Sequence, residues 1–529
     1  MFVTKQEAAQ RQAMDRRVLA PGDAPGDAPG DDALAGTRQQ KRKVAVFVAH
    51  GMGQQVPFET MDSVAAGLIA HAQRNGHPKP AIRTRTCLLD GALSSAANGK
   101  DAKDPQKLQR IEMDLLDAHG QPVEVHVYEG YWASITEGQV TIVDVMKFLW
   151  AGGMNGIRKG GEDFRRWLFD SPVNFGKQRG TVSGLGVALA VLGSLVFANF
   201  LITVTFADQL VGRISGAANS GLAMSHKTFS ALIALMAAWV LFSGMVGWML
   251  NRASKGRRAA WTKGLWWLLG TWVGATMVMG AVPLIALAGV SMDSLGLSLP
   301  MPVAIGVWLA LLLVSREVRN IMIQFPGDVA AYISTHTLDR FQEIRTRIKE
   351  RVGCAARAIY SDKSYTGVVW VGHSLGSVVV YDALNALLTD DALAKDDNKV
   401  RAIARTRLLL TFGSPLDKIA FIFAAQASKP TETRDMLAAS FQPLILDYES
   451  YRKIPWVNIW SPADIISGSL DFYDDLNNNK SKGLEVQNKK DPQATTPLMA
   501  HIEYWENPLL FEHIYEGIVR KDEALAAVR

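Results

Sequence analysis

One serine in this chain of 529 residues stands in a pattern that makes a hydroxyl group a nucleophile. The pattern reads Gly372-His373-Ser374-Leu375-Gly376. An apolar run at 367–371 precedes it and another at 378–388 follows it, which predicts a buried strand, a sharp turn and a helix. We expect small residues beside the turn, because a Cβ atom at either glycine would collide with the neighbouring strand or helix. The pattern therefore predicts a strained turn that exposes the hydroxyl of Ser374.

The segments on both sides of the middle of the chain predict an α/β fold. Residues 44–48 form an apolar, β-branched run that is typical of a buried strand, and residues 123–128 alternate in polarity like a half-buried strand. Apolar residues recur at helical spacing over 59–72 and 338–358, and 509–519 is expected to be a closing helix. Strands and helices therefore occur in both the first and the last part of the chain.

Four long uncharged stretches occupy the middle of the chain. They have 28, 24, 29 and 22 residues. A helix needs about 20 residues to cross the hydrocarbon core of a bilayer, so each stretch is long enough. Pro300 and Pro302 delay the start of a helix in the fourth stretch. We expect four transmembrane helices near 182–207, 228–250, 264–290 and 297–315, the alternative being a buried helical core in a soluble protein.

The basic residues between these stretches predict the topology. Residues 155–179 contain six Lys or Arg and residues 252–263 contain five, whereas residues 208–227 contain two. Loops rich in Lys and Arg stay in the cytoplasm, so an even number of spans places both flanking sections on that side. We expect a multi-pass protein of a plasma membrane, such as the bacterial inner membrane, with both termini in the cytoplasm. Its expected partners are membrane lipids.

The chain accordingly divides into four expected parts. Residues 1–42 contain a repeated Ala-Pro-Gly-Asp sequence and are predicted to be disordered. Residues 43–150 and 326–529 are the two parts of the α/β domain, and residues 151–325 are the membrane insertion. The 56 Lys and Arg exceed the 51 Asp and Glu, but no long basic stripe with interleaved aromatic residues indicates a nucleic-acid partner. Two distant cysteines, Cys87 and Cys354, form no metal-ligand pattern.

With these motifs the sequence resembles the α/β-hydrolase superfamily, and in particular its lipase and esterase branch. The resemblance covers residues 43 to about 140 and 326 to 520. Strand 44–48 with the loop that follows it is similar to the family's strand and oxyanion loop. Residues 408–415 are similar to the strand after the nucleophile helix, and 454–464 to the strand and loop that carry the catalytic acid. The resemblance implies a mostly parallel sheet with helices on both faces, interrupted by the membrane insertion.

The resemblance also implies a catalytic triad in the chain order serine, acid, histidine. A serine hydroxyl is a weak nucleophile at neutral pH and needs a base within hydrogen-bond reach. Only His501 and His513 follow Ser374 in the sequence. We favour His501, which is expected at a loop-to-helix junction, over His513, which lies inside the closing helix and could be a helix-surface or capping residue.

The triad acid is less closely specified than the base. Asp464 is expected at the end of a strand and precedes His501 by 37 residues, and we favour it. Asp417 and Asp471 are the alternatives, and any of these carboxylates could instead be solvated or cap a helix.

Two backbone N–H groups are implied as the oxyanion hole, those of Leu375 and Met52. Several residues are expected to shape the two loops, the histidines by hydrogen bonds rather than by proton transfer. These loop-shaping residues are His50, Gly51, Gly53, Gly372, His373 and Gly376. We interpret Glu129 as part of a structural salt bridge or as a surface carboxylate and assign it no chemistry.

These residues predict a membrane-anchored serine hydrolase that cleaves carboxylic esters through an acyl-enzyme on Ser374. A lipid is the expected substrate class, because the insertion would hold the site at a bilayer surface. No metal or organic cofactor is needed for this chemistry. Phospholipase, lipase, thioesterase and peptidase activities share the same triad. The alternative function is a non-catalytic membrane scaffold or transport-associated protein with a hydrolase-like binding domain.

Overall fold

The computed structural model describes residues 42–88, 107–141, 339–419, 454–470 and 486–520, except for positions 54, 118, 465, 497 and 498. It also describes residues 165–168 and 171–174 and scattered positions between 143 and 332. All of these residues belong to a single compact unit that starts at Arg42.

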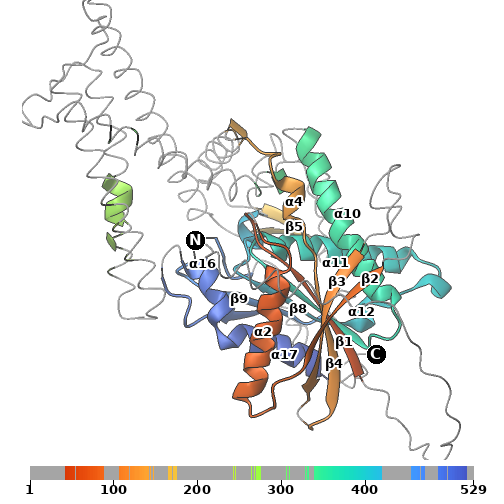
Figure 1. The fold of residues 1–529 in the computed structure, drawn as a ribbon. Coiled ribbons are helices and arrows are strands. Elements are labelled where there is room, and N and C mark those ends of the chain that lie inside the picture. The colour runs from red at the N-terminus through yellow and green to blue at the C-terminus, as the bar shows by residue number, and fades with distance from the viewer. Residues whose placement is uncertain are drawn as a thin grey trace, which may run out of the picture. The chain divides into compact units, whose positions relative to one another are not determined.

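Eight strands form one mixed sheet in the order β10-β9-β8-β7-β1-β4-β3-β2 (Figure 1). Their bounds are β1 Arg42–Ala49, β2 Ile82–Leu88, β3 Lys107–Leu116, β4 Pro122–Glu129, β7 Gly367–His373, β8 Thr406–Phe412, β9 Trp456–Trp460 and β10 Gln487–Lys490. Neighbouring strands from β10 to β4 are parallel, and β3 pairs antiparallel with both β4 and the edge strand β2. The prediction of an α/β fold with a mostly parallel sheet is confirmed.

Strand β1 joins the two halves of the chain. On one side Val44 pairs with Val125 of β4, and on the other it pairs with Gly367 of β7. The β-branched residues from Val44 to Val48 are completely buried, as a strand in the middle of a parallel sheet requires. Sections of the chain that lie on opposite sides of the four uncharged stretches therefore fold into one sheet.

Two layers of helices cover the sheet. Helices α2 (Glu59–Arg74) and α17 (Pro508–Val519) pack on one face, and α10 (Asp339–Ser361) and α11 (Leu375–Leu393) pack on the other (Figure 1). Side chains alternate along β1, so Phe47 joins the core with α10 and α11, and Val46 joins the core with α2 and α17. Short helices are α4 (Ala133–Thr136), α12 (Ala402–Arg405) and α16 (Ala500–Glu503), with 3-10 turns at Asp396–Asn398 and Tyr504–Glu506.

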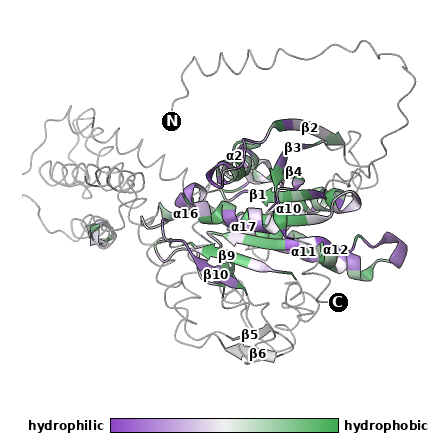
Figure 2. Ribbon diagram, turned by 90° about the horizontal axis from the view of Figure 1, so that it is seen from below, coloured by the Kyte–Doolittle hydropathy of each residue, from purple (hydrophilic) through white to green (hydrophobic). Residues whose placement is uncertain are grey.

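The distribution of hydropathy explains which strands could be predicted. The central strands are hydrophobic, whereas β10 and the connection between α11 and α12 are hydrophilic (Figure 2). Strand β10 has the sequence Gln-Asn-Lys-Lys at the edge of the sheet, and residues 82–86 of β2 are exposed. These strands are held by backbone hydrogen bonds and contribute little to the core, so no apolar pattern marks them in the sequence.

The predicted transmembrane helices lie mostly outside the described residues, as does the predicted disordered segment 1–42. Residues 270–275, within the third predicted span, are helical. Among the residues that the structure describes, no helix combines the length and the apolar character that a membrane crossing needs. Residues from the preceding basic loop form a two-stranded antiparallel sheet of β5 (Arg165–Leu168) and β6 (Ser171–Asn174).

Candidate active site

The candidate residues gather at one edge of the sheet. Ser374 directly follows β7, His50 directly follows β1, and Asp464 lies four residues beyond the end of β9. Because these three strands are parallel, their carboxyl ends meet at the same edge. The loops at this edge therefore bring together residues that are distant in the sequence.

Ser374 occupies the strained turn that the sequence pattern predicts. Its φ of 52° and ψ of −129° are rare for a residue with a side chain and cost on the order of 1 to 3 kcal/mol. A Cβ atom on Gly372 would lie 2.5 Å from Ser377 Cα, and one on Gly376 would lie 2.2 Å from the His50 carbonyl oxygen. The predicted need for glycine on both sides of the turn is therefore confirmed.

The hydroxyl of Ser374 is less open than the pattern alone suggests. The residue is only 1% exposed. The His501 ring bonds to its hydroxyl, and Gly51 lies so close that an added Cβ would stand 2.9 Å from the Ser374 Cβ. The expected exposure is therefore wrong: the turn directs the hydroxyl toward the neighbouring loops, which cover it.

A continuous hydrogen-bond chain connects serine, histidine and aspartate. Nε2 of His501 lies 2.7 Å from Oγ of Ser374, and Nδ1 lies 2.8 Å from Oδ2 of Asp464. A carboxylate can only accept a hydrogen bond, so Nδ1 carries a proton and Nε2 of the neutral ring is free to accept the serine proton. His501 stands at the start of α16, the loop-to-helix junction that was predicted.

Asp464 is held as an ionised acceptor. Besides His501, the Tyr504 hydroxyl donates to Oδ2 at 3.0 Å and the Ile466 N–H donates to Oδ1 at 2.9 Å. Burial alone would raise the pKa of Asp464, but the hydrogen bond and the charge of His501, together with the Ile466 N–H, lower this pKa to about 2. The carboxylate therefore keeps its charge near neutral pH and orients the imidazole.

The structure does not bring the alternative residues to Ser374. Nδ1 of His513, on α17, pairs with Glu516 at 2.7 Å. Asp417 is partly exposed beside Lys418, whose Nζ lies 3.5 Å from it, and packs against Gly468. Asp471 lies outside the described residues. Of the described candidates, only His501 and Asp464 share a hydrogen bond with each other.

His50 orients the loop after β1. The N–H groups of Trp132 and Ala133 donate to its Nε2 at 3.0 and 3.3 Å, so the ring proton is on Nδ1, which donates to the Gly51 carbonyl at 2.8 Å. Burial lowers the pKa of His50 to about 4, so the ring is neutral. Because a trans peptide directs its N–H opposite to its carbonyl, this bond points the Met52 N–H away from His50.

The next peptide of the loop is fixed at both ends. The Gln55 amide donates to the Met52 carbonyl at 3.2 Å, and the Gly53 N–H donates to Asp328 at 2.8 Å. Within the described residues, the N–H groups of Met52 and Leu375 donate no hydrogen bond. Leu375 is also the first residue of the 19-residue helix α11, whose amino end favours negative charge. Two N–H groups without an acceptor among the described residues therefore belong to the residue after Ser374 and to the residue after Gly51, which packs against Ser374.

His373 connects the nucleophile turn to the histidine. Its Nε2 donates to the carbonyl oxygen of His501 at 3.0 Å, and its ring stacks on Phe412 with the centroids 4.8 Å apart. Burial and the charge of the His501 ring lower the pKa of His373 to about 3. A neutral ring with this contact holds the backbone of His501 in place.

The interpretation of Glu129 as a salt bridge or surface carboxylate is wrong. Glu129 is 6% exposed, and no Lys, Arg or His among the described residues forms an ion pair with it. One carboxylate oxygen accepts the Phe58 N–H at 2.7 Å, and the other has no hydrogen-bond partner. Burial raises the pKa of Glu129 to about 7. The side chain of Glu129, the last residue of β4, therefore lies inside the protein rather than in solvent.

Three further residues of the site were not predicted from the sequence. Tyr504 supports Asp464, Trp132 binds both the ring and the carbonyl group of His50, and Asp328 holds Gly53. The spacing of three residues between His501 and Tyr504 places both on one side of a helical turn, which is the one signal that the sequence offers. Trp132 and Asp328 reach the loop only through the fold, so no local pattern marks them.

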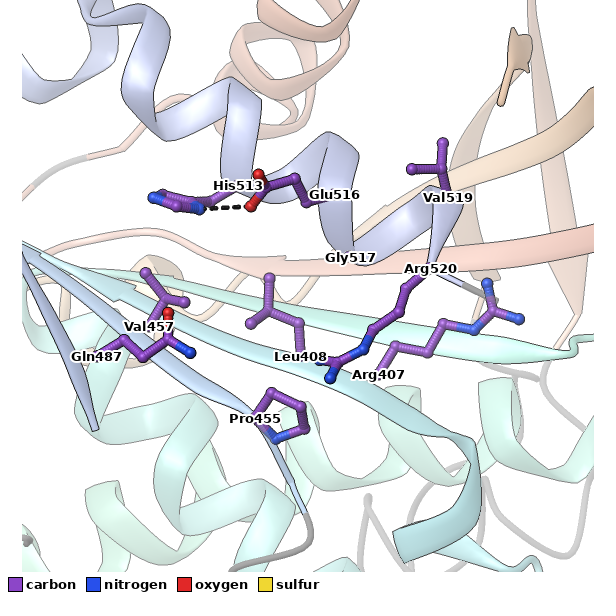
Figure 3. A pocket seen from close by; sticks show the side chains of 10 residues that line it. All are labelled: Arg407, Leu408, Pro455, Val457, Gln487, His513, Glu516, Gly517, Val519 and Arg520. Carbon is purple, nitrogen blue, oxygen red and sulfur yellow. Dashed lines mark hydrogen bonds and ion pairs between the residues drawn. The ribbon is translucent and has the colours of Figure 1, made fainter. Parts of the chain in front are cut away.

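A separate cavity lies at the opposite end of the strands (Figure 3). It has a volume of about 310 Å³ between α17 and the amino ends of β8 and β9. Arg407, Arg520 and the His513–Glu516 pair line it together with apolar side chains (Figure 3). None of the triad residues contributes to its wall. Among the described residues, no group of three or more His, Cys, Asp or Glu side chains is arranged to hold a metal ion.

The arrangement supports proton transfer and stabilisation of an anion. The Ser374 hydroxyl has a base in hydrogen-bond contact, the base has an ionised partner, and the N–H groups of Leu375 and Met52 have no acceptor among the described residues. Comparison of the chain with known protein families, with curated proteins and with solved structures finds no match. The chemical interpretation therefore rests on the geometry of the residues themselves.

Proposed function

We propose that this protein is a serine hydrolase that cleaves carboxylic esters through an acyl-enzyme on Ser374. The observation that carries the proposal is the hydrogen-bond chain from Ser374 through His501 to Asp464, with distances of 2.7 and 2.8 Å. These distances are within the range in which a base can remove a proton from its nucleophile. The strained backbone of Ser374 adds to the support, because strain of this kind persists at sites where a side chain must be presented.

In the first half of the reaction, Oγ of Ser374 attacks the ester carbonyl carbon while Nε2 of His501 accepts the hydroxyl proton. The carbonyl oxygen becomes negative and accepts hydrogen bonds from the N–H groups of Leu375 and Met52. Asp464 stabilises the imidazolium through Nδ1. Collapse of the tetrahedral intermediate breaks the bond to the leaving alcohol, which takes the proton from Nε2, and an acyl-serine remains.

In the second half, a water molecule takes the place of the alcohol. Nε2 of His501 accepts a proton from the water as its oxygen attacks the acyl carbon, and the same two N–H groups bind the oxyanion. The ester bond to Ser374 then breaks, and the proton returns from His501 to Oγ. The products are a carboxylic acid and the regenerated serine, and no redox step or additional reactant is involved.

We also propose that the domain has the α/β-hydrolase fold. In support, the nucleophile turn follows a central strand, β7, and helices cover both faces of the sheet. The neighbours of β7 are β8 and β1, and β1 is followed by the loop that contains Gly51 and Gly53. One feature departs from that fold. The loop that contains Gly51 and Gly53 follows the first described strand, whereas the family's oxyanion loop follows the third strand of its sheet. The departure changes the connection but keeps the loop beside the nucleophile.

A lipid ester is the proposed substrate class. The proposed location is an inner or plasma membrane, with the hydrolase domain on its cytoplasmic side. The support is the sequence between the two halves of the sheet, with uncharged stretches of 28, 24, 29 and 22 residues. Such stretches would keep the site close to a bilayer, where acyl chains are concentrated. Membrane lipids would then be both the surroundings and the source of substrate.

The proposal is tested by ester hydrolysis with the detergent-solubilised full chain. The substrates are nitrophenyl esters of increasing acyl length and phosphatidylcholine vesicles. We expect wild type to hydrolyse at least the soluble esters, and Ser374→Ala and His501→Ala to lose about 10⁴-fold or more in kcat. His513→Ala is the matched control, since it removes the other downstream histidine, and should keep its activity. Hydrolysis that survives in purified Ser374→Ala would refute the assignment.

A further inference from the structure

The loop at residues 50–58 joins β1 to α2 and contains the Met52 donor. Its contacts to the rest of the domain come largely from the segment that follows β4. Trp132 binds His50 at the start of the loop, and the Tyr131 hydroxyl donates to the Gln55 carbonyl at 3.0 Å in the middle. Both ends of the loop must be fixed for the Met52 N–H to keep one position.

Glu129 is placed to fix the far end of this loop. In the sheet it pairs with Val48 of β1, and the following Gly130 N–H donates to the Val48 carbonyl at 2.8 Å. Its side chain accepts the Phe58 N–H at 2.7 Å, one residue before α2 begins. The end of β4 therefore holds the chain both where the loop leaves β1 and where it enters α2.

Phe58 needs such a partner because of its backbone. Its φ is 74°, in the left-handed region that is unfavourable for a bulky residue, and its side chain is half exposed. As the N-cap of α2 it offers no side-chain cap for the first turn. Little in the side chain of Phe58 itself stabilises this conformation, whereas the bond from its N–H to Glu129 does.

We propose that Glu129 is a positioning residue for the oxyanion loop: by holding Phe58, its carboxyl group fixes the loop that presents the Met52 N–H. The inference rests on the proposed hydrolase function. Glu129 has no hydrogen bond to Ser374, His501 or Asp464 among the described residues, so it acts through the loop and not on the substrate. Its buried second oxygen and a pKa of about 7 fit a carboxyl group that is largely neutral below neutral pH.

The test compares Glu129→Leu with Glu129→Gln in the full chain. Leucine fills a similar volume but cannot accept the Phe58 N–H, whereas the glutamine oxygen can. We expect kcat for a soluble ester to fall about 10- to 100-fold in the leucine variant with KM within twofold of wild type, because an oxyanion donor acts mainly in the transition state. Glutamine should restore kcat to within about threefold. If Glu129 only stabilised the fold, the leucine variant would have a lower melting temperature but no selective loss of kcat at an unchanged KM.

Asp391→Leu provides the matched control. Asp391 accepts a hydrogen bond from the N–H of Arg401, which, like Phe58, has a positive φ and directly precedes a helix. Asp391 itself lies near the end of α11 that is remote from Ser374. This variant should lower the melting temperature and leave kcat unchanged. If Glu129→Leu does not fold, Glu129→Asp takes its place, since the shorter side chain withdraws the acceptor and should lower kcat in the same way.

The outcomes separate the inference from the function on which it rests. Wild-type protein without esterase activity would end the proposed function. Active wild type with an unchanged kcat in the leucine variant, or an equal loss of kcat in Asp391→Leu, would overturn the role of Glu129 alone. A glutamine variant as inactive as the leucine variant would also contradict it, since the acceptor would then not be the property that matters.

Discussion

At the scale of single residues, hydrogen bonds from three directions fix the carboxylate of Asp464. His501, Tyr504 and the Ile466 N–H all donate to its carboxylate. Sequence order narrows the base to His501 and His513 because a triad requires an acid and a base after the nucleophile. The expected ends of secondary-structure elements then favour His501 and Asp464. The Tyr504 contact could not be anticipated in this way, since it depends on how α16 is placed over the Asp464 loop.

Asp464→Asn should lower kcat by about 10⁴-fold while the protein stays folded, because the asparagine amide can donate to His501 and stabilise the wrong tautomer. Steady-state kinetics with a soluble ester measure this. Asp417→Asn is the control, since Asp417 is a partly exposed aspartate that follows the neighbouring strand β8, and its ion-pair partner is Lys418. An Asp464→Asn enzyme with more than a tenth of wild-type kcat would show that another acid orients the base.

His50→Phe should lower kcat about 10²-fold, because it keeps a ring on Trp132 but releases the Gly51 carbonyl and with it the Met52 N–H. The change should also alter the pH dependence of stability. Burial lowers the pKa of His50 to about 4, so the unfolded chain binds a proton below about 6.5 before the folded chain does. Wild type therefore loses this stability as the pH falls from about 6.5 to 4, and the variant does not.

Melting temperatures between pH 4 and pH 8 check the second part of this prediction. His71→Phe is the control for activity, since His71 is a histidine on α2 whose ring packs at a tilt against Tyr515 outside the site. Unchanged kcat in His50→Phe would mean that the Gly51 peptide needs no support from this ring.

At the scale of elements, the strand, turn and helix around Ser374 form a unit whose spacing depends on glycine. Helix α11 starts so close to the end of β1 that a Cβ on Gly376 would lie 2.2 and 2.4 Å from two backbone carbonyl oxygens. The sequence could predict this unit because its strand and helix are both strongly apolar. It could not predict β2 and β10, whose side chains are polar at the sheet edges. Strand β3 was missed although Ile111, Met113 and Leu115 alternate there with polar residues.

Gly376→Ala should destabilise the protein by about 3 kcal/mol, because backbone atoms on the opposite side cannot move aside as a flexible side chain would. Gly353→Ala, in the middle of α10, meets only the end of the Arg357 side chain at 3.6 Å and should instead stabilise by up to about 1 kcal/mol. Chemical denaturation measures both free energies of unfolding. Equal effects at the two positions would mean that α11 and β1 are not packed as closely as described.

At the scale of the whole molecule, the pairing of β1 with β7 sets a condition on the insertion. The chain leaves the domain after the first group of strands and returns before β7, so both segments must lie on the same side of any membrane. The sequence predicts this through the two base-rich loops and an even number of spans. The assembly of both halves into one sheet could be expected only from the resemblance, since each half alone carries an incomplete set of site residues.

Tags at the two ends of the chain should therefore both be accessible from the cytoplasmic side, and the protein should remain with membranes after an alkaline carbonate wash. Protease protection in intact spheroplasts and in inverted vesicles measures this. A mutant that replaces residues 176–325 with a short flexible linker should be released from the membrane fraction. Full-length protein in the soluble fraction, or tags on opposite sides, would contradict the predicted topology.

The most direct test of the central claim is covalent labelling with a fluorophosphonate probe, followed by mass spectrometry of the modified peptide. The account predicts one adduct, on Oγ of Ser374, that is absent in Ser374→Ala and strongly slowed in His501→Ala. Folded wild-type protein that stays unlabelled, or an adduct that persists in Ser374→Ala, would contradict it.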